Sequence, residues 1–188
     1  MLTSSDPQLI ERFRQGDSYA FDALVGRHKE RIFNLAYRMT GDADWAEDIT
    51  VEVFLEVYAS LPQFKNRAKF STWLHRLAVN VCLEHLRARR FYPQPGGEPL
   101  EKYEAPASAD PAEIAMNRDL AQRIVQAMQA LPEAQRLAVI MYYLEERTCA
   151  EIAEILQIPR NTAKTRVFYG TQVLRDRLRA EGVLSSTG

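Results

Sequence analysis

Cysteine is scarce in this chain of 188 residues, which holds only Cys82 and Cys149. The two lie far apart and form no C-x-x-C pair, so we expect free thiols in a reducing compartment rather than a structural disulfide. No stretch approaches the roughly 18 apolar residues that a membrane-spanning helix requires. The N-terminal residues show neither the positive nor the apolar region of a secretory signal. The sequence therefore predicts a cytoplasmic protein without membrane insertion.

Net charge is also nearly absent, since 24 Lys and Arg oppose 25 Asp and Glu and leave a formal charge of −1. That total argues against a generally basic protein that coats nucleic acid. Catalytic signatures are missing as well, because the chain has no P-loop, G-x-G-x-x-G, H-E-x-x-H or G-x-S-x-G motif. Cys82 and His85 stand at i, i+3, but His28 and His75 supply no matching second pair of metal ligands. We therefore expect no enzyme, no metal and no cofactor, and we place His85 on an apolar helix face in the core.

Strand signals are weak, because no alternating run is bounded by hairpin turns. Helical periodicity covers the chain instead, over about 6–16, 17–41, 42–62, 71–90, 112–130, 133–145, 148–156 and 161–179. Residues suited to capping the starts of these helices include Asp6, Asp17, Asp42, Ser71 and Asn161. The predicted fold class is all-α.

A change of composition divides the chain. Residues 93–111 contain five prolines and a Gly-Gly pair and show no periodicity, which is typical of a linker. The sequence therefore predicts two small helical domains, residues 1–92 and 112–188, joined by a flexible acidic linker over 93–111.

Charge is sorted along the chain although its sum is near zero. Residues 1–59 carry six bases and eleven acids, whereas 60–92 carry seven bases against Glu84 alone. The stretch 160–180 carries six bases against Asp176. Such sorting indicates contacts with polyanions at two separate places. Solvated helix faces are the alternative explanation for any single charge run.

The helix predicted after Ser71 has two different faces at 100° per residue. One is an apolar stripe around Leu74. The other carries an exposed aromatic, cations and an amide, namely Trp73, Arg76, Asn80, Arg87 and Arg90, with Leu83 among them. Just before it, a short loop interleaves Phe64, Lys65, Asn66 and Arg67 with Phe70. Aromatics among cations suit unpaired bases, because a base can be stacked on only after it leaves the duplex. Packing between helices is the alternative role for Trp73 and Phe70.

A helix-turn-helix is predicted near the C-terminus. Thr148 and Glu151 form the capping box T-x-x-E of a short helix, and Pro159 interrupts the pattern before a second one. The second helix buries an apolar stripe of Ala163, Val167, Gly170, Leu174 and Leu178. It turns Thr165, Phe168, Tyr169 and Gln172 outward beside Lys164 and Arg175, an arrangement used in the DNA major groove. The alternatives are a hydrophobic contact within the domain for Phe168 and an ion pair within the domain for Arg166.

The chain resembles bacterial extracytoplasmic-function sigma factors over nearly its whole length. Three stretches carry the resemblance: AEDITVEVFLEVY (46–58), FKNRAKFSTWLHRLAVNVCLEHLRARR (64–90) and LPEAQRLAVIMYYLEERTCAEIAEILQIPRNTAKTRV (131–167). The family consists of sigma domain 2, a linker and sigma domain 4. The resemblance implies a protein that binds core RNA polymerase, recognises the −10 and −35 promoter elements, promotes DNA melting and directs transcription initiation of a specific regulon.

The resemblance also implies roles for particular residues. Contacts with the clamp helices of the polymerase β′ subunit are expected from Asp48, Val51, Glu52, Phe54 and Leu55. Contacts with the −10 element are expected from Phe64, Lys65, Asn66, Arg67, Phe70, Trp73, Arg76, Asn80, Arg87 and Arg90. Contacts with the −35 element are expected from Arg160, Asn161, Thr162, Lys164, Thr165, Arg166, Phe168 and Tyr169. The β flap of the polymerase and an anti-sigma factor are further expected partners.

The chain departs from the family pattern in two places. The polymerase-binding motif D-L-T-Q-E reads Asp48-Ile49-Thr50-Val51-Glu52 here, with Val51 in place of glutamine. Tyr169 and Thr171 stand where the family often has arginine. A different class of function stays open beside the sigma-factor hypothesis, namely a helix-turn-helix interaction or adaptor protein without initiating activity.

Overall fold

The computed structural model describes residues 4–65, 68–91 and 111–184, apart from the side chains of 89–91 and 111–118. The described ranges contain α-helices and one 3-10 helix and no strand, so the all-α prediction is confirmed. Two compact units divide the chain, Met1–Tyr37 with Trp45–Pro95 and Arg38–Asp44 with Gly96–Gly188, and each is described by itself. Within the described ranges no helix is long and apolar enough to cross a bilayer. Except for Pro111, the predicted linker lies outside the described residues, and the proposed domain limits stay a prediction.

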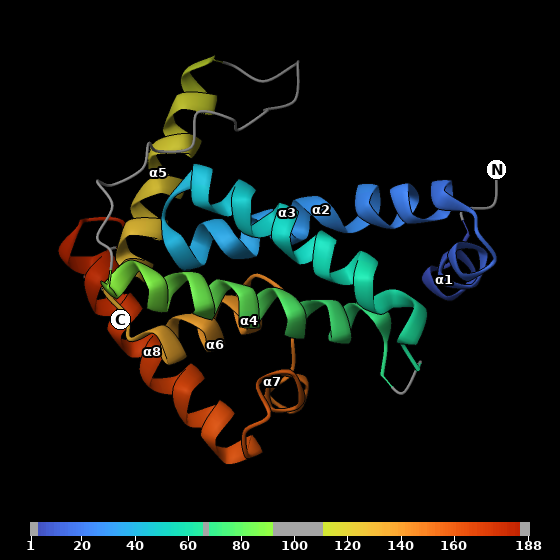
Figure 1. Cartoon of the computed structure of the whole chain (residues 1–188). Coiled ribbons are helices and arrows are strands. Elements are labelled where there is room, and N and C mark those ends of the chain that lie inside the picture. Colours follow the sequence, from blue (N-terminus) through green and yellow to red (C-terminus); the bar gives the residue numbers. More distant parts are fainter. Residues whose placement is uncertain (1–3, 66–67, 92–110, 185–188) are drawn as a thin grey trace. The chain divides into compact units, whose positions relative to one another are not determined.

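The first unit is built around three long helices. It contains α1 (Asp6–Arg14), α2 (Ser18–Thr40) and α3 (Ala43–Ser60) except for their residues within Arg38–Asp44, the 3-10 helix η1 (Leu61–Gln63) and α4 (Phe70–Phe91). Figure 1 shows α2, α3 and α4 running alongside one another, with α1 near one end. Their inner faces supply fully buried apolar side chains, including Leu24, Ile32, Leu35, Ile49, Val53, Val57, Leu74 and Ala78. Each large side chain buried in this way contributes roughly 1.5–3 kcal/mol.

The second unit places its last helix against the other three. It contains α5 (Pro111–Gln129), α6 (Glu133–Tyr143), α7 (Cys149–Leu156) and α8 (Arg160–Ala180), and α8 packs on α5, α6 and α7. The core between them includes Val125, Met128, Leu137, Ile140, Ile152, Ile155, Ala163 and Val167. The apolar stripe predicted for the last helix is therefore the face that α8 turns inward at Ala163, Val167 and Gly170.

One buried cation fixes the connection between α5 and α6. Arg136 is 7% exposed. Its guanidinium donates to Oε1 of Gln129 and, at 3.2 Å each, to the main-chain carbonyls of Gln129 and Leu131. Carbonyls at the C-terminal end of a helix have no partner inside that helix. Arg136 supplies the missing donors and so ties α6 to the end of α5.

The start of α1 differs by one residue from the prediction. Ser5 rather than Asp6 is the N-cap, and its backbone N–H donates to Oε1 of Gln8 at 2.8 Å. Asp6 instead accepts from Arg27 and lies 2.9 Å from Nε2 of His28, both on α2. The carboxylate of Asp6 therefore joins α1 to α2, a tertiary role that a local capping pattern does not reveal.

Two later helices also begin one residue or more before the proposed caps. α4 starts at Phe70, which places Ser71 inside its first turn. Pro159 precedes α8, which places Asn161 inside that helix. Polar residues near a helix start can bond the backbone at several positions, so sequence patterns locate the start only to within one or two residues.

Gly170 lies where α8 passes close to α6, and this contact generates a first prediction. A Cβ atom at Gly170 would meet Cγ2 of Val139 at 2.7 Å and the main-chain oxygen of Gln135 at 3.2 Å. We expect Gly170→Ala to destabilise the protein by about 1–2 kcal/mol. The overpacking cost of roughly 1–3 kcal/mol exceeds the helix-propensity gain of up to about 1 kcal/mol.

Gly26 in α2 is the matched control, because a Cβ atom there would meet nothing within 4 Å. Gly26→Ala should stabilise the protein by about 0.5–1 kcal/mol. Urea unfolding of the two variants should therefore shift in opposite directions. A stabilised Gly170→Ala variant would contradict the close approach of α6 and α8.

His28 generates a second prediction, on pH. The side chain is 8% exposed, contacts Asp6 and packs edge-on against Phe70 with ring centroids 5.4 Å apart. Burial lowers the pKa of His28 below its ordinary value of 6.5, and the Asp6 carboxylate opposes part of that shift. Because the unfolded chain binds the proton more tightly, this contribution to stability is complete above pH 6.5 and is lost as the pH falls below it.

We expect the free energy of unfolding of the wild type to fall more steeply below pH 6.5 than that of His28→Gln, which has no titrating ring. Urea unfolding at several pH values between 5 and 8 measures the difference. An identical pH dependence in both proteins would show that His28 is not buried in its neutral form.

Candidate polymerase-docking and nucleic-acid surfaces

The outer face of α3 is acidic and apolar. Asp44 and Asp48 are exposed, and Val51 and Leu55 are 61% and 66% exposed on the same face. We call these four residues the docking face. Large apolar side chains left in solvent beside carboxylates fit a partner surface that combines apolar and basic groups. Phe54, expected among the contact residues, is 7% exposed and therefore belongs to the core beneath this face.

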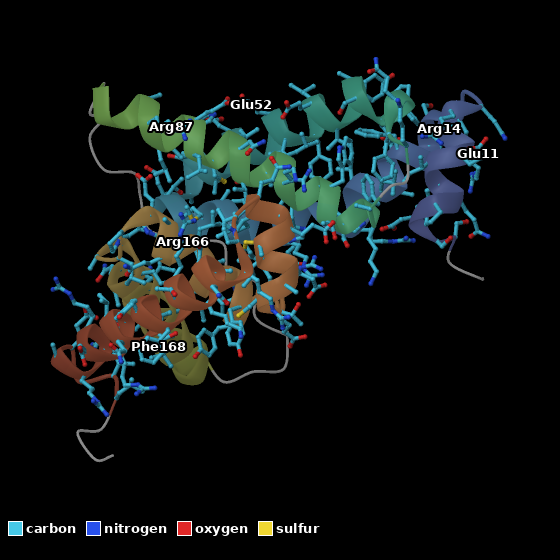
Figure 2. All side chains as sticks on the ribbon, turned by 90° about the horizontal axis from the view of Figure 1, so that it is seen from below. Glu11, Arg14, Glu52, Arg87, Arg166 and Phe168 are labelled. Atoms are coloured by element: carbon cyan, nitrogen blue, oxygen red, sulfur yellow. The ribbon has the colours of Figure 1, made fainter. Side chains whose placement is uncertain are left out.

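His85 lies at the edge of the docking face and not in the core, which corrects the prediction for this residue. Its Nε2 is 2.6 Å from Oε2 of Glu52, and its ring meets Trp45 edge-on at 5.8 Å. The side chain of His85 is 27% exposed. The contact joins α4 to Glu52, one of the expected polymerase-binding residues, whose position on α3 is labelled in Figure 2.

Cys82, the other proposed member of a metal pair, is buried one turn away. Burial raises the pKa of its thiol to about 12, so the thiol stays protonated and is a poor metal ligand. Among the described residues, no group of three or more His, Cys, Asp or Glu side chains is arranged to hold a metal ion.

The polar face predicted for α4 is the face that the structure exposes. Trp73 and Arg76 are half-buried, whereas Asn80 and Arg87 are exposed, and Figure 2 labels Arg87 near the end of the helix. We call these four residues the α4 face. Lys65 in the preceding loop is also exposed. Asn66 and Arg67 lie outside the described residues, and the same holds for the side chain of Arg90.

Two of the aromatics proposed to stack on bases are buried. Phe64 and Phe70 are 7% and 6% exposed, with their ring centroids 6.1 Å apart. Trp73 packs on both, at 4.8 Å from Phe64 and 5.8 Å from Phe70. Packing between elements is therefore the role of Phe70 and also of Phe64. Trp73 is the ring of the three that stays partly open to solvent, with the buried pair behind it.

In the second unit, α7 and α8 form the predicted helix-turn-helix. Thr148 and Glu151 make the capping box, with Thr148 Oγ1 accepting from the backbone N–H of Glu151 at 3.2 Å and Glu151 Oε2 accepting from that of Thr148 at 2.9 Å. Gln157 ends α7 in the left-handed region at φ 52°. The N–H of Ile158 then bonds the carbonyl of Ala153 at 3.0 Å, which closes the turn before α8.

The outer face of α8 carries the residues expected at the −35 element. Arg160, Asn161, Lys164 and Thr165 are exposed, and Thr162 is half-buried. A helix with exposed cations and hydrogen-bonding side chains in its N-terminal half can present them to phosphates and base edges in a major groove.

Phe168 and Arg166 do not follow the alternatives considered for them. Phe168 is 57% exposed and meets Tyr169, 53% exposed, edge-on at 5.3 Å. It is therefore not packed inside the domain. Arg166 is half-buried, and the ion pairs found among the described residues do not include it. Figure 2 shows both labelled residues on α8.

Arg14 is a residue that the sequence patterns did not single out. Its guanidinium donates to the main-chain carbonyl of Phe64, 50 positions away in the sequence. Every residue type offers a carbonyl, so no motif could announce this contact. Arg14 also lies outside the two basic segments found by counting charges.

The fold and its exposed surfaces are those of a helical protein with one helix-turn-helix unit and a second unit that pairs an acidic helix with a polar one. The family described as Sigma-70 region 2 matches residues 24–92, and Sigma-70, region 4 matches residues 121–170. The chain is 35% identical over 178 residues to the ECF RNA polymerase sigma factor SigW of Bacillus subtilis, covering 90% of this chain and 95% of that protein. It is also 35% identical to the RNA polymerase sigma-H factor of Pseudomonas aeruginosa, covering 93% and 94%. The chain belongs to the extracytoplasmic-function sigma factors of the sigma-70 family.

Solved structures show the same fold. The sigma factor RpoE of Bartonella quintana, solved with the anti-sigma factor NepR, matches with a TM-score of 0.68 at 18% identity, over 85% of this chain and 96% of that one. CnrH, solved with the cytosolic domain of CnrY, matches with a TM-score of 0.69 at 17% identity, over 94% and 99%.

The capping box of α7 generates a third prediction. Thr148→Ala removes the oxygen that accepts from Glu151 and should cost about 1 kcal/mol of unfolding free energy. Thr148→Ser keeps that oxygen and should change the unfolding free energy little, because serine caps a helix at least as well as threonine. Urea unfolding of both variants measures the difference, and equal losses would mean that the hydroxyl does not cap the helix.

Proposed function

We propose that this sigma factor binds core RNA polymerase in the cytoplasm, recognises −10 and −35 promoter elements, promotes DNA melting and directs initiation from a specific set of promoters. The exposed α4 face carries the proposal. It combines a supported aromatic ring, an amide and cations on one helix, which together suit stacking, base-edge hydrogen bonding and phosphate contact.

We assign the −10 element to the first unit and the −35 element to the second. Trp73 offers a ring surface to an unpaired base, and the buried Phe64 and Phe70 hold that ring from behind. Asn80 and Arg87 lie along the same helix at the spacing of a single face. The exposed N-terminal half of α8 suits a closed duplex at the −35 element.

Melting would draw its free energy from base capture and from polymerase contacts. The chain has no nucleotide-hydrolysis motif, so an unstacked base held by the protein must offset the stacking that the duplex loses. Stacking of a base on an aromatic side chain contributes roughly 1–3 kcal/mol. We propose no catalytic role for this chain.

We assign polymerase binding to the docking face on α3 together with Glu52, with the β′ clamp helices as the partner. Exposed Val51, where the family pattern has glutamine, adds apolar area at the centre of this face. The β flap is proposed as the partner of the second unit. An anti-sigma factor is proposed as a regulator, because the similar RpoE structure was solved with the anti-sigma factor NepR and the CnrH structure with the cytosolic domain of CnrY.

Transcription with purified core polymerase over a randomised promoter library tests the function directly. We expect initiation to depend on the added chain and the recovered promoters to share two sequence elements. A chain that binds polymerase without initiating from any member of the library would instead be an adaptor, the alternative function considered above.

The α4 face generates a fourth prediction. Trp73→Ala and Asn80→Ala should each slow open-complex formation by roughly fivefold to a hundredfold, which corresponds to the 1–3 kcal/mol of a lost base contact. Affinity for core polymerase should change little, because neither residue belongs to the docking face. Trp73→Tyr keeps an aromatic face and serves as the control. Unchanged opening rates for both alanine variants on a recovered promoter would exclude base capture by this face.

A further inference from the structure

The chain directly after η1 is bonded to α1. Arg14, the last residue of α1, donates to the main-chain carbonyl of Phe64. The helix itself packs against η1. Phe13 adds ring contacts with Tyr58 at 5.3 Å and with Phe21 at 5.5 Å. α1 is therefore fixed to the rest of the unit, and it fixes the chain directly after η1.

Phe64 is the residue through which this contact reaches Trp73. Its N–H bonds the carbonyl of Leu61 at 3.2 Å, which ends η1. Its ring is buried and packs on Trp73 at 4.8 Å. Its carbonyl belongs to the peptide that continues to exposed Lys65. By bonding that carbonyl, Arg14 sets the orientation of the peptide between the ring that supports Trp73 and the first cation of the loop.

Arg14 has a second partner on its own helix. Its Nη1 lies 3.6 Å from Oε2 of Glu11, which is 59% exposed, and Figure 2 shows the two side chains on α1. An exposed ion pair at this distance contributes little, whereas a charged donor on a partly buried carbonyl is among the stronger hydrogen bonds. The carbonyl contact is therefore the one with structural consequence.

We propose that Arg14 is a positioning residue for capture of the unpaired −10 strand: it holds the peptide after Phe64 so that Trp73 and Lys65 meet the strand together. The inference rests on the function proposed above. It gives a role in promoter binding to α1, which holds none of the residues proposed to contact the promoter. Arg14 acts through the loop and does not touch DNA.

Arg14→Met is the test variant, because it keeps the apolar stem of the side chain and removes every donor. Arg14 borders an open cavity of about 480 Å³ that is also lined by Phe13, Tyr58 and Pro62, so a change of its tip leaves no sealed void. Arg14→Lys, which restores one donor, is the rescue variant. Glu11→Ala and Arg12→Ala are controls on the same helix, since Arg12 pairs with Asp17.

The measurement is the affinity of holoenzyme for a fluorescent single-stranded DNA that carries the non-template −10 sequence recovered from the promoter library. We expect Arg14→Met to weaken binding about tenfold, Arg14→Lys to recover most of that loss, and both controls to bind like the wild type. Affinity for core polymerase should stay unchanged in all four variants. Because Arg14→Met loses the bond to the Phe64 carbonyl, its thermal unfolding midpoint should fall by a few degrees, so binding is measured well below that midpoint.

Salt dependence separates positioning from direct contact. A side chain that neutralises a phosphate of a single strand contributes roughly 0.7 to the slope of log affinity against log salt. We expect Arg14→Met to lower the affinity without changing that slope. A slope reduced by that amount would show that Arg14 binds the strand itself and would overturn the proposal.

Three other results would also overturn it: wild-type affinity in Arg14→Met, no recovery in Arg14→Lys, or an equal loss in Arg12→Ala. Failure of the underlying function is recognised separately. In that case wild-type holoenzyme would bind the strand no better than core polymerase alone, and no variant could then be compared.

Discussion

Backbone groups at helix ends lack partners within the helix, and in this chain the side chains that satisfy them also fix the functional surfaces. Arg14 bonds the carbonyl of Phe64 after η1, beside the ring that supports Trp73. Arg136 bonds carbonyls at the end of α5 and so anchors α6, on which α8 packs. Thr148 and Glu151 satisfy each other's N–H groups at the start of α7. In each case a polar contact with the backbone sets the path of the chain next to an element that carries exposed candidate site residues.

A formal charge of −1 results from surfaces with opposite tasks. The docking face on α3 is acidic, which suits the basic protein surface that we propose as its partner. The α4 face and the outer side of α8 carry cations instead, which suit contact with phosphates. Mixing these charges along every helix would weaken both kinds of contact. The His85–Glu52 contact, 2.6 Å long, lies where the acidic helix and the polar helix meet and pairs one group from each. The sorting of charge is thus a property of individual helix faces, which a total hides.

Helix positions and exposed faces followed from the sequence because both depend on a local period. The inward stripe of α8 at Ala163, Val167 and Gly170 and the outward α4 face both came from 3.6-residue spacing. The errors concern residues whose role is decided by a distant partner. His85 lies at a helix–helix boundary with Glu52, 33 positions away, and Phe64 is buried by packing on Trp73. Arg14 was missed entirely, since its acceptor is a main-chain carbonyl that leaves no trace in the pattern of side chains.

Because the acceptor of Arg14 is a main-chain group, its proposed supporting role does not depend on the side chains proposed to read the −10 element. A side chain that recognises a base must change when the promoter sequence changes, and a brace bonded to it would have to change as well. Arg14 bonds the backbone of residue 64, and the bond survives substitution of any loop side chain that keeps the main-chain path. Under the proposed function, a change of specificity at Lys65 or Asn80 therefore leaves the bond between Arg14 and the Phe64 carbonyl in place. The ring pair behind Trp73 is more constrained, because the 4.8 Å contact with Phe64 depends on the identity of both side chains. Under the proposed function, the bond from α1 to the Phe64 carbonyl and the contact between Phe64 and Trp73 are therefore the constrained parts of this surface, whereas the side chains of Lys65 and Asn80 can vary.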